Sequence, residues 1–276
     1  MPEQTVASYT DEQIRDVIEE AVGEFGDDSY PRWYAITGSH VYGINSESSD
    51  VDVRGIHTTS RERYAQVHGT PKQEVRLNMD GVTEGYEHVS DIDLRSYELR
   101  HFGEHLLSAN FNIMELVMCA PQVMNGIPLS IDALRGILRE YLPLDVPNSY
   151  LGMAKSNYYS YLDPDKSEAY DPVPKKFLYV YRALLAAIYT EEQGEICADV
   201  TELAKRVDTG NPSLVQAGIN AKRDQEVETV PDELESWFRD EITDAFTAQP
   251  EFQDVDHDTR QSYGSEIDRW METVRA

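Results

Sequence analysis

The stretch WYAITGSHVYGINSESSDVDVRGIHT occupies residues 33–58 and decides the fold. It begins with a short apolar run, Trp33 to Ile36, which predicts a buried strand that ends before Gly38. After a polar segment, the alternating run from Val51 to Ile56 predicts a second strand. We therefore expect two strands, connected by a polar loop that starts with a glycine.

Two acidic residues stand at the start of the second predicted strand. Side chains two residues apart in a strand share a face, so Asp50 and Asp52 are expected to converge on one small volume. Like charges this close favour a cation between them, and an all-oxygen ligand pair suits Mg²⁺. The alternative is that Ser49 and Asp50 are ordinary polar residues at the start of a strand and bind nothing. Gly38 and Ser39, ten residues upstream, favour the site, because glycine lets backbone N–H groups approach a phosphate.

A third acid follows in another alternating run. The segment YEHVSDIDL, residues 86–94, predicts a strand that carries Asp91 and Asp93 on one face. It is preceded by strand-like residues 73–79, and Asp80-Gly81 is a typical two-residue hairpin turn. We expect this hairpin to return Asp93 towards the first two acids.

These motifs resemble those of the nucleotidyltransferase superfamily that includes DNA polymerase beta. The superfamily signature is Gly-Ser, ten residues, Asp-x-Asp, and a distant acid between two hydrophobic residues. The chain matches it at 38–39, 50–52 and 92–94. The RNA-repair branch, associated with RNA ligases, is the most similar. Its features are matched by Tyr42-Gly43, by Ser49 to Gly55 and by NFNIMELV at 110–117, where Phe111 replaces a proline.

The resemblance implies an α+β fold with a small mixed β-sheet, a palm-like nucleotidyltransferase core flanked by helices. An all-helical C-terminal part is expected to follow. The segment from Pro121 to Pro128 suggests a boundary, so we expect a catalytic domain at 1–125 and a helical domain at 126–276. Helical periodicity predicts helices at 97–107, 130–142 and 174–193, and four more before the C-terminus.

The resemblance also assigns basic residues in the helical part. The branch carries Gly-x-Ala-Lys, matched by residues 152–155, and a later helix led by lysine with an internal arginine. It implies that Lys155, Lys176 and Arg182 contact phosphate or the acceptor. Phe177 stands where the family often has histidine, which makes the register of that helix less secure.

The resulting hypothesis is metal-dependent transfer of NMP from an NTP to a hydroxyl acceptor. Asp50, Asp52 and Asp93 are expected to hold two Mg²⁺ ions about 3.5–4 Å apart, with Mn²⁺ as a substitute. Gly38 and Ser39 are expected to seat the β- and γ-phosphates. ATP is the expected NTP, and an RNA end is the preferred acceptor over a protein. The alternatives are a non-catalytic nucleotide or RNA-end sensor and an antitoxin-like enzyme that transfers AMP to a protein.

Composition sets the expected environment. The 276 residues include 51 acidic and 24 basic ones, for a net charge of −27. Repulsion among the excess acidic side chains would destabilise the fold in dilute salt, but it is screened at molar salt. The charge therefore favours a salt-rich cytoplasm, as in halophiles, over the alternative of an acidic partner for a basic protein. Cys119 and Cys197 are expected to be buried thiols. No leader-like or long apolar stretch is present, so we expect a cytoplasmic protein without a membrane span.

The sequence HFGEH, residues 101–105, fits the His-x-x-Glu-His pattern of inverted zinc peptidases. The pattern is short, it contains a glycine within a predicted helix, and no third ligand is evident. We therefore favour a chance match over a zinc site.

Overall fold

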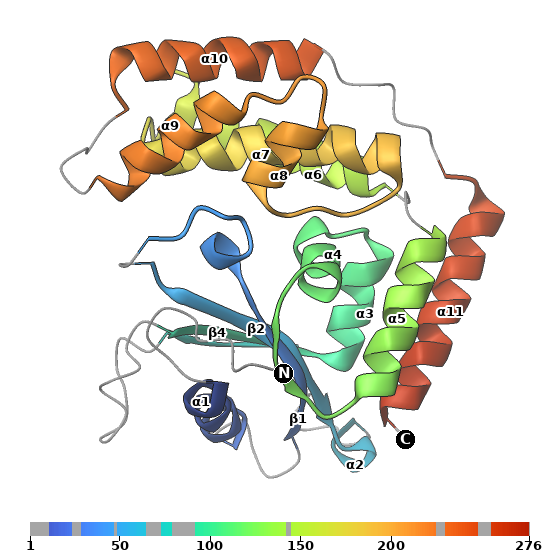
Figure 1. The fold of residues 1–276 in the computed structure, drawn as a ribbon. Helices are drawn as coiled ribbons and strands as arrows, with labels where there is room; N and C mark the ends of the chain where they lie inside the picture. Colours follow the sequence, from blue (N-terminus) through green and yellow to red (C-terminus); the bar gives the residue numbers. More distant parts are fainter. Residues whose placement is uncertain are drawn as a thin grey trace.

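A computed structural model of the chain describes residues 11–23, 29–46, 49–64, 73–78, 92–141, 145–224, 230–247 and 255–275. These residues form the expected α+β fold, with a mixed sheet in the N-terminal part and a mostly helical C-terminal part (Figure 1). Within the described residues, no helix combines the length and apolar character needed to cross a membrane.

The described sheet has five strands in the order β3-β4-β2-β1-β5. Strands β2 and β4 are parallel, and the other neighbouring pairs are antiparallel. The strands are β1 (Ser29–Thr37), β2 (Val51–Thr59), β3 (Glu74–Asn78), β4 (Ile92–Glu98) and β5 (Gln122–Asn125).

Strand β4 differs from its prediction. It continues to Glu98, so Tyr97 belongs to the strand and not to the following helix. Tyr97 pairs with Glu74 of β3 and is buried on the face opposite α1, which favours the extended conformation over the helical periodicity of the sequence. The predicted turn at Asp80-Gly81 and the start of the predicted strand at residue 86 lie outside the described residues.

Helices cover both faces of the sheet. On one face, α1 (Asp11–Gly23) buries its apolar side against alternate residues of the strands, among them Val51 and Val53. On the other face, α3 (Leu99–Leu107) and α4 (Phe111–Met118) pack over residues such as Trp33 and Ile56. The alternation predicted for β2 is thus confirmed, since the valines point towards α1 and the even-numbered residues point away from it.

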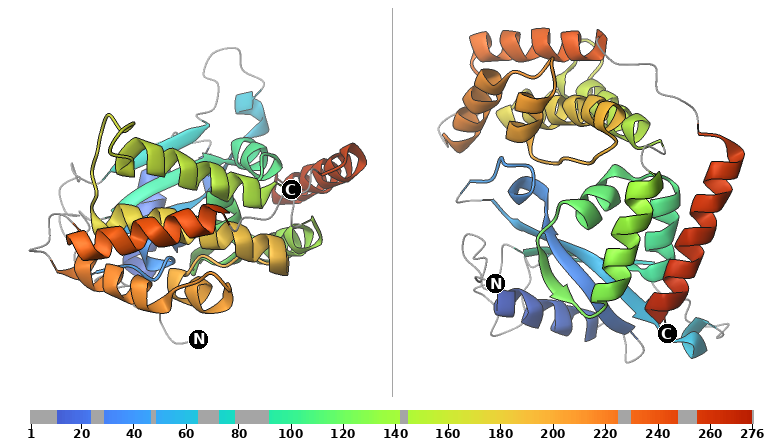
Figure 2. Two further views of the ribbon diagram at one scale, coloured as in Figure 1. Left: turned by 90° about the horizontal axis from the view of Figure 1, so that it is seen from above. Right: turned by 45° about the vertical axis from the view of Figure 1, so that its right-hand side comes forward.

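The C-terminal half consists mainly of helices that lie beyond one end of the sheet (Figures 1 and 2). A short α2 (Arg61–Tyr64) follows β2. The later elements are α5 (Pro128–Tyr141), α6 (Val146–Asn157), a π-helix (Tyr158–Leu162), α7 (Pro174–Gln193), α8 (Val200–Arg206), α9 (Pro212–Arg223), α10 (Asp232–Thr247) and α11 (His257–Arg275). Helix α7 is the most buried of these and packs against α6, α8, α9 and α10.

Helix α11 returns to the first half of the chain, alongside α5 (Figures 1 and 2). The Trp270 indole N–H donates to the backbone oxygen of Ser130 at 2.7 Å, and the Tyr263 hydroxyl donates to that of Leu106 at 3.1 Å. The domain boundary at residues 125/126 stays a prediction. However, α5 and α11 both follow that boundary and pack on helices that precede it.

Candidate active site

The predicted motifs meet at one end of the sheet. Strand β1 ends at Thr37, which pairs with Asp52 near the start of the antiparallel β2. On the other side of β2, Asp52 pairs with Asp93, near the start of the parallel strand β4. Both acids are partly buried, and Asp50 precedes β2 with an exposed side chain. The register therefore places two of the three predicted acids side by side, with the third at the same end of the sheet.

The residue that follows β1 has to be a glycine, because it lies against the side chain of Asp52. Gly38 has a φ of 68°, a left-handed conformation that residues with a Cβ rarely adopt. A Cβ at this position would lie 1.9 Å from Oδ2 of Asp52. Gly38 opens a 3₁₀ turn that ends at His40, and Ser39 within this turn is buried. The Gly-Ser turn and the aspartate strand are thus in direct contact.

We expect Gly38→Ala to lower the rate of the NMP transfer predicted from the sequence about 100-fold. Displacing a group of an active site by about 1 Å has effects of that size. Gly194→Ala is the matched control. Gly194 also has a left-handed φ, of 65°, but a Cβ there would meet nothing within 4 Å. Both variants should lose about 1–2 kcal/mol of stability from backbone strain. Initial rates and urea unfolding of both variants check the prediction, and equal activity in the two would contradict it.

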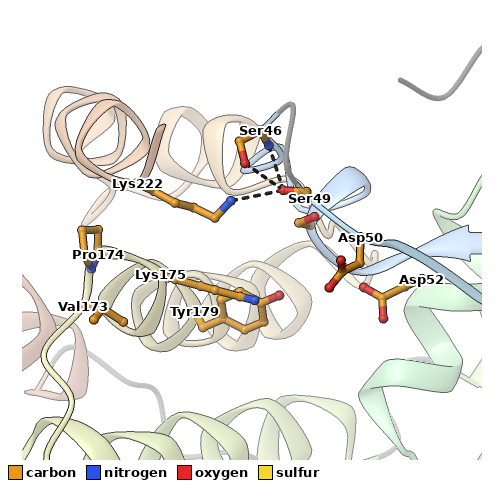
Figure 3. Close-up of a pocket in the computed structure, with 10 residues that line it drawn as sticks. Ser46, Ser49, Asp50, Asp52, Val173, Pro174, Lys175, Tyr179 and Lys222 are labelled. Atoms are coloured by element: carbon orange, nitrogen blue, oxygen red, sulfur yellow. Dashed lines mark hydrogen bonds between the residues drawn. The ribbon is translucent and has the colours of Figure 1, made fainter. Parts of the chain in front are cut away.

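A pocket of about 290 Å³ opens between this end of the sheet and the helical half (Figure 3). Asp50 and Asp52 lie on one side, and Lys175, Tyr179 and Lys222 lie on the other. Among the described residues, the lining consists of Ser39, Ser46, Ser49, Asp50, Asp52, Val173, Pro174, Lys175, Tyr179 and Lys222. Carboxylates thus face ammonium groups across a space lined with hydroxyl groups, an arrangement suited to a metal–phosphate ligand.

The cations that line the pocket differ from those that the resemblance implied. Lys222, from α9, donates to the Ser49 hydroxyl at 3.4 Å, and Ser49 also accepts from the backbone N–H of Ser46 at 2.9 Å. Burial lowers the pKa of the Lys222 ammonium, and the charges of Lys175 and Arg223 lower it further. A bound anion would therefore stabilise the charged form of Lys222. Nothing in the local sequence distinguishes Lys222, which lies 170 residues beyond Asp52 in the chain.

Asp52 has a charged partner in the structure. The Arg54 guanidinium lies 3.2 Å from Oδ1 of Asp52, with both side chains about one-fifth exposed. Burial by itself lowers the pKa of Arg54, but the Asp52 carboxylate raises it and the net shift is upward. In the described part of the chain, no three His, Cys, Asp or Glu side chains are placed to hold a metal ion. Asp52 and Asp93, paired on neighbouring strands, nevertheless offer the carboxylate oxygens that Mg²⁺ prefers.

The three basic residues assigned from the resemblance do not line the pocket. Lys155 is exposed on α6, and the Lys176 ammonium lies 3.6 Å from the centre of the Tyr161 ring. Arg182 is buried, with 1% of its side chain exposed, and forms an ion pair with Glu115 of α4. The expected phosphate contact of Arg182 is not what the structure shows, since this guanidinium is enclosed in the core. Lys175, one residue before Lys176, occupies the pocket instead.

Arg182 links the two halves of the chain. Its guanidinium stacks on the Tyr42 ring, 3.7 Å from the ring centre. Its partner Glu115 also accepts a hydrogen bond of 2.7 Å from the Tyr150 hydroxyl. Glu115 belongs to the NFNIMELV motif, and Tyr42 to the Tyr-Gly motif. Two of the resembling motifs therefore converge on a buried ion pair beside the pocket.

The histidines of the HFGEH pattern make local contacts. Nδ1 of His101 lies 3.2 Å from Glu104, and the His105 ring packs edge-on against Tyr97. Burial lowers the pKa of His105, and the charge of His101 lowers it further. These contacts give the pattern a structural role on α3.

A comparison with known protein families covers the residues that form the site. A family model described as "RNA repair pathway DNA polymerase beta family" matches residues 32–272. The chain belongs to this family. The match includes most of β1, all of β2 and β4, and the helices that line the pocket, and its description confirms the resemblance to the RNA-repair branch. The RNA repair pathway family consists of nucleotidyltransferases related to DNA polymerase beta, which supports nucleotidyl transfer as the general reaction. A search of curated proteins found no match.

Proposed function

We propose that the protein transfers NMP from an NTP, with ATP as the first candidate, to a hydroxyl acceptor and releases pyrophosphate. An RNA end is the preferred acceptor, because the family model describes an RNA repair pathway. The observation that supports this proposal is the geometry of the pocket. The Gly-Ser turn contacts Asp52, Asp52 pairs with Asp93, and Lys175 and Lys222 lie across the pocket from Asp50 and Asp52.

In this proposal, the pocket orients the triphosphate. The N–H groups and hydroxyl of the Gly38-Ser39 turn seat the β- and γ-phosphates. Lys175 and Lys222 stabilise the charge that develops on pyrophosphate as it leaves. The acceptor oxygen forms a bond to the α-phosphorus, the bond from that phosphorus to the bridging oxygen breaks, and the hydroxyl proton passes to solvent.

Asp52 and Asp93 are the residues that would hold Mg²⁺ or Mn²⁺, with Asp50, at the same end of the sheet, as the third candidate ligand. When bound, such ions lower the pKa of the attacking hydroxyl and neutralise charge on the phosphates. The ion pair with Arg54 orients the Asp52 carboxylate. Lys155 and Lys176 lie outside the pocket, so we assign them to the acceptor and not to the triphosphate.

We expect Lys222→Met to raise the KM for NTP about 10- to 100-fold, because a hydrogen bond to a charged group contributes about 1.5–3 kcal/mol. Lys205→Met is the matched control, since Lys205 is 58% exposed and pairs with Glu202 away from the pocket. The measurement is KM for NTP at saturating acceptor. If both variants kept the KM of the unaltered protein, Lys222 would not contact the triphosphate.

The function itself is tested with four labelled NTPs, each offered with RNA, protein and small hydroxyl acceptors. The reactions contain Mg²⁺ or Mn²⁺ and molar KCl, because a net charge of −27 calls for strong screening. Labelled RNA with release of pyrophosphate supports the proposal. NTP binding without any transfer would instead indicate a sensor, and a labelled protein would indicate an AMP-transferring modifier.

A further inference from the structure

Lysines are scarce in this acidic chain and are concentrated in the segment that leads into the pocket-lining start of α7. The chain has seven lysines, of which Lys155, Lys166, Lys175 and Lys176 fall within residues 146–176. Four acidic residues in the same segment balance them, so the segment is neutral while the chain as a whole carries −27. A polyanion would meet less repulsion here than over an average part of this protein.

Aromatic side chains accompany these lysines on a wide helical turn. The backbone N–H of Asp163 donates to the oxygen of Tyr158 at 3.0 Å, the five-residue spacing of a π-helix. Such turns are rare and occur frequently at functional sites. On this turn, Tyr159 is 47% exposed, and the Lys166 ammonium lies 4.8 Å from the centre of its ring. Tyr161 is partly buried against the core, and the Lys176 ammonium lies 3.6 Å from the centre of its ring.

This arrangement continues into the pocket. The backbone N–H of Asp171 donates to the oxygen of Tyr161 at 2.8 Å, which fixes the segment before α7 to the π-helix. Val173, Pro174 and Lys175, which follow directly, line the pocket. Two consecutive residues of α7 therefore connect the pocket with the π-helix. Lys175 lines the pocket, and Lys176 covers the ring of Tyr161.

We propose that Lys155, Tyr159, Tyr161, Lys166 and Lys176 form an acceptor surface that binds the single-stranded end of a nucleic acid. Bases stack on exposed aromatic rings without regard to sequence, and ammonium groups pair with the phosphates between them. Lys155 lies four residues before Tyr159, close enough to contact an adjacent phosphate. This inference rests on the proposed function, because it names the acceptor of the same pocket.

The test compares two exposed tyrosines. Tyr159→Ala removes a ring of the acceptor surface, and Tyr30→Ala is the matched control. Tyr30 is 48% exposed on β1 and has the Arg32 guanidinium 6.0 Å from its ring centre. The probe is a fluorescein-labelled single-stranded RNA of about ten nucleotides, with a DNA of the same sequence as a second probe. Anisotropy titrations without NTP are run at the lowest KCl concentration that preserves native circular dichroism.

We expect Tyr159→Ala to weaken RNA binding at least about five-fold, the lower range for loss of one stacked base. Tyr159→Phe and Tyr30→Ala should bind as the unaltered protein does. Equal RNA affinity in Tyr159→Ala and the unaltered protein would overturn the inference, and so would transfer to a protein acceptor that Tyr159→Ala leaves unchanged. Because binding is measured without NTP, an absence of nucleotidyl transfer would refute the proposed function while the binding comparison still decides the acceptor surface.

Discussion

Asp52→Asn should reduce nucleotidyl transfer about 1,000-fold or more while the protein remains folded. Asparagine has nearly the same shape as aspartate but lacks the charge that holds a divalent ion, and ion-assisted catalysis contributes several kcal/mol. Asp52 is central to the site, since it pairs with Thr37 and Asp93 and contacts Gly38. The measurement is product formation from labelled ATP at saturating Mg²⁺.

Stability provides the necessary control for this variant. The Asp52–Arg54 pair is partly exposed, so its loss should change the free energy of unfolding by about 1 kcal/mol or less. Asp16→Asn, an exposed position on α1, removes the same charge away from the site and should retain full activity. Product formed by Asp52→Asn at the unaltered rate would reject the assignment of Asp52 to the reaction.

Arg182→Met should destabilise the protein by about 3–5 kcal/mol, because removing one partner of a buried ion pair leaves the other charged and unpaired. The side chains of Arg182 and Glu115 are 1% and 0% exposed. Arg182 also supports the Tyr42 ring, so its loss removes a packing contact between the two halves of the chain. Urea unfolding at molar KCl, followed by circular dichroism, measures the effect.

An exposed arginine–glutamate pair serves as the comparison. Arg206 and Glu202 are 53% and 41% exposed, and Arg206→Met should lose about 1 kcal/mol at most. Adding Glu115→Leu to Arg182→Met should restore part of the lost stability, because the unpaired buried charge is then gone. If Arg182→Met and Arg206→Met were equally stable, the buried pair would not connect the two halves in the way described.

The motifs around the acids could be predicted because their signals are local. Alternation in residues 51–56 requires only neighbouring positions to reveal which side chains face the core, and it placed Val51 and Val53 correctly. Boundaries were less predictable. Strand β4 ends later than the periodicity suggested, since pairing with β3 holds Tyr97 in the sheet. β5, in the segment taken for a boundary, also depends on its pairing with β1.

The sequence alone determined the candidate acids, the family and, through the resemblance, the α+β class, because the motifs depend on residue types at short, regular spacings. Tertiary structure decided which cations complete the pocket. Lys222 and Lys175 reach it from helices whose packing no short-range pattern encodes, whereas Arg182 is turned into the core by Glu115. The physical reason is that exposure and partnership of a long basic side chain depend on what packs around its helix, and those neighbours are distant in the chain.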